Sequence, residues 1–347
     1  MKLTIDSLNM VEATLGLPEQ IEKAAKQALQ ISELPDHEDI QNVVVLGMGG
    51  SGIAGDVMVA AAGPLMPVPV IVCKDYGAPA FVDSTTLVFA ISFSGNTEET
   101  LEAATEAYED GARMVVVTSG GELAKLASQW SVPLVEVPRT IPQPRAAIGA
   151  LSIPPLVILE KVGLFAGSSR WIELCIEQLI ARRAEIDSDD GICNRVAAKI
   201  GGGIPLIYGA DSIGQVAGLR WKNQINENAK LLSFTATYPE LCHNELAGWG
   251  QLGDVSRQLF TLINLRNPEE HPQIARRVDL VTQILGEVTA GSAEVFGQGE
   301  GELSQLFDLM FVGDIVSLLL AQAHGVDPGP IPVLVDLKEE LAKPTAE

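Results

Sequence analysis

The chain has 347 residues, of which 47% are apolar and 5% aromatic, and a chain of this length can bury two hydrophobic cores of ordinary size. Its 45 acidic residues outnumber its 23 basic residues, and a net charge of -22 disfavours nucleic acids and anionic membranes as partners. The four cysteines are far apart and form no CxxC pair, so we expect reduced thiols. Asp6 precedes any apolar run, and no stretch reaches the roughly 18 uninterrupted apolar residues of a membrane span, so we expect a soluble, cytoplasmic protein.

The first half of the chain predicts a parallel β-sheet with helices between its strands. An amphipathic segment at about residues 10–33 predicts helix, and the run 42–47 predicts a buried strand that leads into glycines. Further short runs rich in β-branched residues predict strands at 68–73, 87–92, 113–118 and 132–137. Strands that alternate with helices are typical of a doubly wound α/β sheet.

The second half repeats this organisation after a helical stretch at about 145–187, which contains Pro154 and Pro155. We expect strands at 204–209, 231–235 and 259–264, and helices at about 213–229 and 302–324. Segments 43–56 and 205–218 each place a glycine-closed strand and a serine before a small-residue helix, which is a weak sign of internal duplication.

The C-terminal segment is rich in proline and ends in a short helical pattern, so it predicts an extended arm followed by a short helix. We therefore expect an α/β fold with two doubly wound parallel sheets flanked by helices. The expected division is an N-terminal unit at 1–155, a C-terminal unit at 156–325, and the arm and helix at 326–347.

A glycine-rich segment, Gly47–Gly52, directly follows the first predicted strand. Its glycines let backbone amides approach an anion at the N-terminus of the next helix, where the helix dipole is positive. The same letters match the dinucleotide-binding pattern GxGxxG, and Asp75 lies where such a site would need a ribose-binding acid. This motif by itself leaves a compact phosphate and a dinucleotide equally open.

A second segment follows the predicted strand at 87–92 and offers three hydroxyls, Ser92, Ser94 and Thr97, ahead of a helix. Hydroxyls and backbone amides suit a compact phosphate with many oxygens. Helix capping by Ser94 or Thr97 is the alternative, and such caps are commoner than ligand loops. Two loops of this composition after separate strands favour a phosphate site over a dinucleotide site.

These segments, together with others along the chain, resemble the bifunctional phosphoglucose/phosphomannose isomerase family. The matching segments occur in the family's order over almost the whole chain, and they are GMGGSGIAGD, SFSGNTEET, PRAAIGAL, NENAK, PELCHNELAGW and DLKEEL. The resemblance implies two sugar isomerase (SIS) subdomains, a hexose 6-phosphate substrate, and no metal or organic cofactor. The implied reaction interconverts glucose 6-phosphate and fructose 6-phosphate, and in the family also mannose 6-phosphate.

The resemblance also assigns residues to the binding of substrate. It implies that backbone amides and hydroxyls hold the sugar phosphate, and the residues are Gly49, Gly50, Ser51, Ser92, Ser94 and Thr97. Arg145 matches the family's arginine that faces the developing enediolate, where a guanidinium stabilises oxyanion charge. Without the resemblance, the sequence favours a surface arginine at a helix start.

Three further residues take catalytic roles by the same resemblance. Glu227 matches the general base that carries a proton between C1 and C2, His243 matches the acid/base for ring opening, and Lys338 matches a lysine that assists near the ring oxygen. Without the resemblance, the sequence would indicate a solvated acid at Glu227, a capping or core histidine at His243, and a surface lysine paired with acids at Lys338. No histidine has a metal-ligand spacing such as HxxxH, so no metal site is expected. The resemblance further implies a homodimer in which His243 reaches into the partner's pocket.

One position departs from the family pattern. Family members commonly carry Thr-Pro shortly before the terminal lysine, whereas this chain has Ile331 and Pro332. The lost hydroxyl would leave a C2 oxygen or a bridging water without a partner, at about 1 to 3 kcal/mol. We therefore expect a preference for glucose 6-phosphate over mannose 6-phosphate.

Two alternatives of other classes remain at this point. A non-catalytic sugar-phosphate sensor would use the same fold, but such regulators carry a basic helix-turn-helix that this sequence lacks. A dinucleotide-dependent oxidoreductase would bind NADH or NADPH at the glycine-rich segment, and we expect no such binding.

Overall fold

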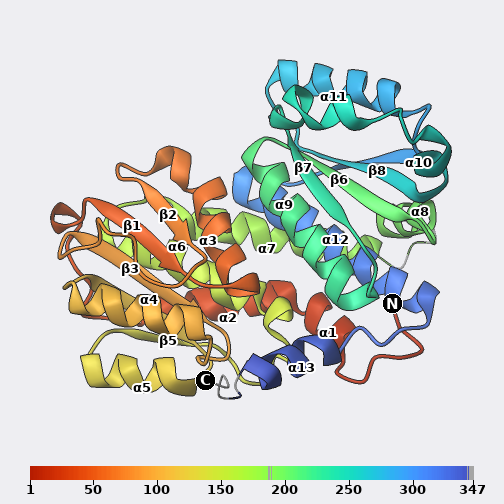
Figure 1. The fold of residues 1–347 in the computed structure, drawn as a ribbon. Coiled ribbons are helices and arrows are strands. Elements are labelled where there is room, and N and C mark those ends of the chain that lie inside the picture. Colours follow the sequence, from red (N-terminus) through yellow and green to blue (C-terminus); the bar gives the residue numbers. More distant parts are fainter. Residues whose placement is uncertain (187, 189, 342, 344–347) are drawn as a thin grey trace.

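The computed structural model describes residues 1–186, 188, 190–341 and 343, and it contains two parallel β-sheets that lie side by side (Figure 1). The N-terminal sheet has the strand order β2-β1-β3-β4-β5, and the C-terminal sheet has the order β7-β6-β8-β9. The strands of the N-terminal sheet are β1 (Asn42–Leu46), β2 (Val70–Cys73), β3 (Thr86–Ser92), β4 (Arg113–Thr118) and β5 (Leu134–Glu136). Those of the C-terminal sheet are β6 (Ile204–Ala210), β7 (Phe234–Tyr238), β8 (Phe260–Arg266) and β9 (Gly291–Phe296).

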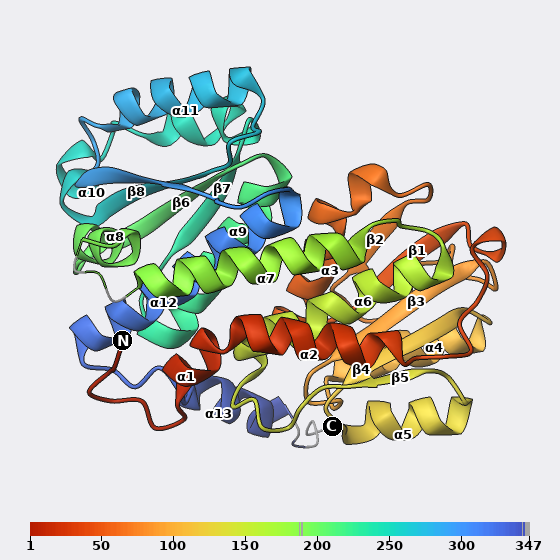
Figure 2. The same cartoon turned by 180° about the vertical axis from the view of Figure 1, so that it is seen from behind.

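Helices connect the strands and cover both faces of each sheet (Figures 1 and 2). In the first half they are α1 (Met10–Leu15), α2 (Leu17–Leu29), α3 (Gly49–Ala61), α4 (Glu98–Glu109), α5 (Gly121–Trp130), α6 (Ile148–Val162) and α7 (Ser168–Glu185). In the second half they are α8 (Ile192–Ile200), α9 (Asp211–Gln224), α10 (Gly253–Leu259), α11 (Pro272–Leu285), α12 (Glu302–His324) and α13 (Pro332–Leu341). Short turns of other helix types include a 3-10 helix at Pro144–Ala146, a π-helix at Ile225–Ala229 and a 3-10 helix at Glu240–His243.

One continuous hydrophobic core joins the two sheets. It contains side chains from one face of the N-terminal sheet, such as Val45 and Phe89, and from one face of the C-terminal sheet, such as Ile207 and Ile263. Helices α2, α3, α6, α9 and α12 contribute the residues between them. Smaller clusters cover the outer faces, beneath α4 and α5 on one side and beneath α11 on the other. This shared core fixes the two units relative to each other.

Helix α12 lies in the middle of that core and is buried along almost its whole length. Among the described helices it is long and apolar enough to cross a bilayer, but 83% of its most apolar window is buried inside the protein. A helix that is apolar on every side suits such a central position. We therefore interpret α12 as a core helix.

The predicted fold class, two parallel sheets flanked by helices with a C-terminal arm and short helix, is confirmed, although some elements differ from the prediction. The strand predicted at 231–235 begins later, at Phe234. The chain leaves the π-helix at Lys230 with a φ of 56° and pairs with β6 only from Phe234 onward. The sequence reasoning identified neither β9 nor α11. The division at residues 155 and 325 stays a prediction. All four cysteines are free thiols.

Candidate active site

Two loops meet at the carboxyl edge of the N-terminal sheet, where β1 and β3 are neighbours. Leu46 at the end of β1 pairs with Ala90 on β3, so the loops that follow the two strands emerge side by side. The backbone amide of Phe93 donates to Ser51 Oγ at 3.2 Å and links them directly. The edge next to a change in strand order is where open α/β sheets bind their ligands.

The first loop leads into α3 with a backbone that only small residues allow. Gly49 has a φ of +51° and open space where a side chain would begin. A Cβ on Gly50 would lie 3.3 Å from the carbonyl oxygen of Pro144, so the loop is in close contact with the segment that carries Arg145. Because no side chain caps α3, the amides of Gly49 and Gly50 have no acceptor within the described part of the chain. These amides are available to an anion.

The second loop is held by its own hydroxyls. Ser92 Oγ lies 2.9 Å from Thr97 Oγ1 and accepts from the amide of Gly95 at 3.1 Å, while Ser94 Oγ accepts from the amide of Asn96 at 3.2 Å. Thr97 stands at the N-cap of α4 but makes no side-chain cap bond. Capping of α4 therefore does not explain these hydroxyls, and the first turn of the helix stays open to a ligand.

A third loop, which the sequence reasoning missed, supports the second. Ser119 Oγ, just after β4, donates to the carbonyl of Phe93 at 2.6 Å, and Asn96 Oδ1 accepts from the amide of Glu122 at 2.9 Å. A side chain on Gly95 would collide with the backbone of Gly120. The pattern of a strand followed by Thr-Ser-Gly-Gly was the available signal for this loop.

Arg145 and Glu227 come together beside these loops although they are 82 positions apart in the sequence. Arg145 Nη1 lies 3.6 Å from Glu227 Oε2, and the Arg145 side chain is 5% exposed whereas that of Glu227 is 34% exposed. Glu227 lies on the π-helix that continues α9, a feature that occurs frequently at functional sites. A buried cation thus faces a carboxylate that solvent and substrate can reach.

The guanidinium of Arg145 is held by three further acceptors. Its Nε donates to Asn228 Oδ1 at 2.7 Å, and its Nη2 donates to the carbonyls of Pro328 and Gly329 at 2.5 and 2.6 Å. Burial lowers the pKa of Arg145, an effect that the neighbouring Glu227 opposes. These neutral acceptors fix the guanidinium without neutralising its charge, which leaves that charge for an oxyanion.

A buried ionic network lies behind Arg145 and connects it to α12. Arg220 Nη2 donates both to the carbonyl of Arg145 at 2.9 Å and to Asp314 Oδ2 at 2.6 Å, and Gln224 Nε2 donates to Asp314 Oδ1 at 2.8 Å. Asn228 Nδ2 continues the network to Gln224 Oε1 at 3.3 Å. Burial raises the pKa of Asp314, and the Arg220 charge opposes this shift. Asp314, a carboxylate within the apolar helix α12, was the sequence signal for this network.

The C-terminal arm closes over the same place. Lys230 Nζ donates to the carbonyls of Glu227 and Asp327 at 2.7 and 2.8 Å, and so ties the π-helix to the arm. Asp327 Oδ1 in turn accepts from the amides of Ser7 and Gly329. Burial lowers the pKa of Lys230, with Arg145 acting in the same direction. The arm therefore positions the carbonyls that hold Arg145.

Two of the residues expected at the site, His243 and Lys338, are not bonded to this cluster among the described residues. His243 is exposed at the end of the 3-10 helix after β7, and Lys338 is exposed on α13. No hydrogen bond or ion pair among the described residues connects either of them to Arg145 or Glu227. Ile331 is half-buried just before α13, where its carbonyl accepts from the amide of Leu334.

Asp75 follows β2 and accepts from the amide of Tyr76 at 2.8 Å. Within the described residues there is no group of three or more His, Cys, Asp or Glu side chains that could hold a metal ion.

The parallel sheets and glycine and hydroxyl loops define a protein of the SIS-domain class. A model of the SIS domain family matches residues 38–131, and a model of the bacterial phospho-glucose isomerase C-terminal SIS domain matches residues 191–341. The chain is 36% identical over 338 residues to the bifunctional phosphoglucose/phosphomannose isomerase of Caldicellulosiruptor bescii. The aligned residues cover 96% of this chain and 99% of the relative. It is 34% identical over 307 residues to the protein of the same name from Thermoplasma acidophilum, over 87% of this chain and 90% of the relative. The chain belongs to the bifunctional phosphoglucose/phosphomannose isomerase family.

Solved structures agree on the fold. A hypothetical protein from Thermus thermophilus superposes with a TM-score of 0.73 at 15% identity, covering 96% of this chain and 91% of that chain. The C-terminal domain of glucosamine-fructose-6-phosphate aminotransferase from Francisella tularensis superposes with a TM-score of 0.67 at 16% identity, over 93% and 97%. At these identities the similarity shows the arrangement of two SIS units and no particular activity.

Proposed function

We propose that this protein is an aldose-ketose isomerase that interconverts glucose 6-phosphate and fructose 6-phosphate, with mannose 6-phosphate as a further substrate to be tested. The observation that carries the proposal is the pair formed by buried Arg145 and accessible Glu227, beside two loops whose amides and hydroxyls suit a phosphate. The similarity to relatives named for this reaction supports the same conclusion. A role in glycolysis or gluconeogenesis would follow from these substrates.

Each part of this site has a role in the reaction. The phosphate would bind the loops through residues Gly49, Gly50, Ser51, Ser92, Ser94 and Thr97. Glu227 would remove the proton from C2 of the open-chain aldose and return it to C1, while the hydroxyl proton moves from O2 to O1. Arg145 would stabilise the enediolate oxygen that carries negative charge between these steps. Holding the arginine in place beforehand avoids reorganisation during the reaction.

Ring opening needs a second acid/base, and we assign it to His243 with help from Lys338. Since His243 is exposed and has no bond to Glu227 among the described residues, we propose a homodimer in which it enters the partner's site. Exposed apolar side chains on α13 support an interface, and they include Val333, Val335, Leu337 and Leu341. Four free thiols support a cytoplasmic location.

The experiment that tests the proposed function follows fructose 6-phosphate with the wild type and with Glu227→Gln, and measures glucose 6-phosphate and mannose 6-phosphate separately. We expect the substitution to lower kcat by about 10³-fold, because the amide cannot accept the proton. Glu269→Gln, an acid after β8, is the matched control and should stay within about twofold. Wild-type protein that binds fructose 6-phosphate without converting it would instead indicate a sugar-phosphate sensor.

A complementation experiment tests the shared site separately. In a mixed dimer of Glu227→Gln and His243→Ala subunits, one of the two composite sites keeps both native residues, so about half of the wild-type activity should return. If His243 acts within its own subunit, both sites of the mixed dimer carry a substitution and activity stays absent.

A further inference from the structure

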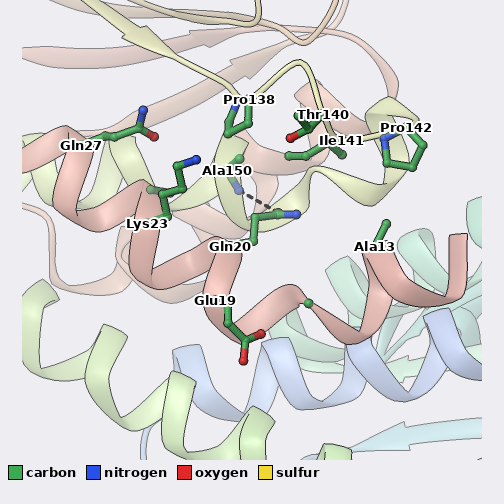
Figure 3. Close-up of a pocket in the computed structure, with 12 residues that line it drawn as sticks. Ala13, Glu19, Gln20, Lys23, Gln27, Pro138, Thr140, Ile141, Pro142 and Ala150 are labelled. Carbon is green, nitrogen blue, oxygen red and sulfur yellow. Dashed lines mark hydrogen bonds between the residues drawn. The ribbon is translucent and has the colours of Figure 1, made fainter. Parts of the chain in front are cut away.

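Helix α2, near the N-terminus of the chain, is hydrogen-bonded to the segment that follows Arg145 by the side-chain amide of Gln20. Gln20 Nε2 donates to the carbonyl of Ala146 at 2.9 Å, and Gln20 Oε1 accepts from the amide of Ala150 at 3.0 Å. The second bond is the dashed line in Figure 3. These two partners lie one and five positions after Arg145.

Gln20 binds the carbonyl of Ala146 and the amide of Ala150. These two groups would bond to each other if α6 began closer to Arg145. An α-helix pairs each amide with the carbonyl four residues earlier, which here would be Ala150 with Ala146. Gln20 satisfies both groups instead, at a helix start where Ala147 provides no side-chain cap. The chain before this point consequently forms the separate 3-10 turn Pro144–Ala146 that contains Arg145.

The neighbouring packing leaves little freedom on this side. A Cβ on Gly149 would lie 2.8 Å from Ile21 Cγ1 and 3.0 Å from Gln20 Oε1, so α2 and α6 are in close contact there. On the opposite side, Arg220 Nη2 donates to the carbonyl of Arg145 at 2.9 Å. The backbone around Arg145 is thus fixed from α2 and from α9 at once.

We propose that Gln20 is a positioning residue that sets the backbone of Arg145, and through it the place of the guanidinium opposite Glu227. The proposal rests on the catalytic role assigned to Arg145 in the proposed function. Gln20 itself lies on the other side of this segment, on a surface pocket of about 260 Å³ that α2 forms with the loop around Pro138–Pro142 (Figure 3). Its effect on the reaction is therefore indirect.

The pocket supplies a matched control. Gln27 lies on the same helix and lines the same pocket, but its side chain makes no hydrogen bond within the described part of the chain (Figure 3). Gln20→Met and Gln27→Met make the same chemical change with and without loss of the two bonds. We expect Gln20→Met to lower kcat about tenfold with KM within about twofold, and Gln27→Met to change neither by more than about twofold.

A double-mutant cycle separates positioning of Arg145 from general destabilisation. If Gln20 acts through Arg145, Gln20→Met should lower the residual kcat of an Arg145→Lys enzyme by less than about twofold. The same tenfold loss in both backgrounds, or a Gln20→Met enzyme indistinguishable from Gln27→Met, would overturn the proposal.

A measurement that needs no turnover keeps this proposal distinct from the proposed function. In protein labelled with ¹⁵N-arginine, the Arg145 Nε–H signal, identified by its loss in Arg145→Lys, reports the bond to Asn228. We expect Gln20→Met to speed its hydrogen exchange at least about tenfold, and Gln27→Met to leave it unchanged. If the Arg145 Nε–H exchanges at an unchanged rate in Gln20→Met, the positioning role is overturned, even when the protein is an active isomerase. If the exchange is faster but the wild type has no isomerase activity, only the proposed function is refuted.

Discussion

The carboxyl edges of the two sheets differ although both follow the same strand, turn and helix pattern. At the N-terminal sheet, the turn after β1 ends in glycines and α3 begins without a side-chain cap. At the C-terminal sheet, Asp211 follows β6 and its Oδ1 accepts from the amide of Ile213 at 3.0 Å, so a carboxylate occupies the start of α9. Its other oxygen accepts from Asn267 Nδ2 at 2.7 Å, after β8.

The second edge is also closed by its backbone. A Cβ on Gly214 would lie 2.7 Å from the carbonyl carbon of Gly209, which shows how tightly the start of α9 packs on the end of β6. Burial raises the pKa of Asp211, opposed by the bond from Asn267. A carboxylate and a closed turn cannot receive a phosphate, whereas free amides and hydroxyls can. The first edge thus leaves amides and hydroxyls open to an anion, and the second unit supplies Glu227 from the helix that follows its closed turn.

The largest expected loss of activity follows from removing the charge of Arg145 beside the N-terminal edge. Arg145→Gln should lower kcat by about 10³-fold, because it removes the only guanidinium that faces Glu227 among the described residues. Arg257→Gln, on exposed helix α10, makes the same change away from that edge and should stay within about twofold. Steady-state kinetics with fructose 6-phosphate measures both, and a loss below about tenfold for Arg145→Gln would show that its charge is not used.

A smaller effect is expected where the loop touches the Arg145 segment. Gly50→Ala places a methyl group 3.3 Å from the carbonyl oxygen of Pro144, so the loop that we propose binds the phosphate would have to shift. We expect KM for fructose 6-phosphate to rise about tenfold, equivalent to about 1.4 kcal/mol of binding. Gly202→Ala adds the same methyl group to open space before β6 and serves as the control. Equal KM values for the two variants would argue against phosphate binding at this loop.

The smallest effect concerns the choice between epimers. Ile331→Thr restores the hydroxyl of the family pattern beside the arm, and we expect it to raise mannose 6-phosphate turnover relative to glucose 6-phosphate by about fivefold, as one added hydrogen bond would. Val255→Thr, at an exposed position of α10, introduces the same side chain away from the arm as a control. Parallel assays of both aldoses measure the ratio. A wild-type enzyme that already turns over both equally would contradict the predicted glucose preference.

The sequence predicted much of the fold because the central strands are buried on both faces and form short β-branched runs. Strand β3 is buried at every position, and the predicted range 87–92 agrees with it to within one residue. Edge strands gave weaker signals. Strand β7 carries the exposed Phe234, and β9 begins at a glycine and alternates small and polar residues, so neither forms an apolar run.

The site was predictable only in part from local patterns. The glycine and hydroxyl loops carry their signal in adjacent residues, whereas the approach of Arg145 to Glu227 depends on the bonds that Arg145 makes to Arg220, Asn228 and Gly329 across the chain. The roles of Gln20 and Asp314 depend on backbone groups and buried partners that no short motif records. The role assigned to His243 rests on the sequence resemblance, because this residue is exposed and has no bond to Arg145 or Glu227 among the described residues.

Glu227 is proposed to move a proton through an enediol, and deuterium incorporation tests this step directly. When fructose 6-phosphate is converted in D₂O, the side chain of Glu227, which is 34% exposed, can exchange its proton with solvent before it is returned. We predict deuterium at C2 of the glucose 6-phosphate formed, measured by NMR, and loss of both incorporation and turnover in Glu227→Gln. Conversion that places no deuterium at C2, or incorporation that persists in Glu227→Gln, would contradict the account.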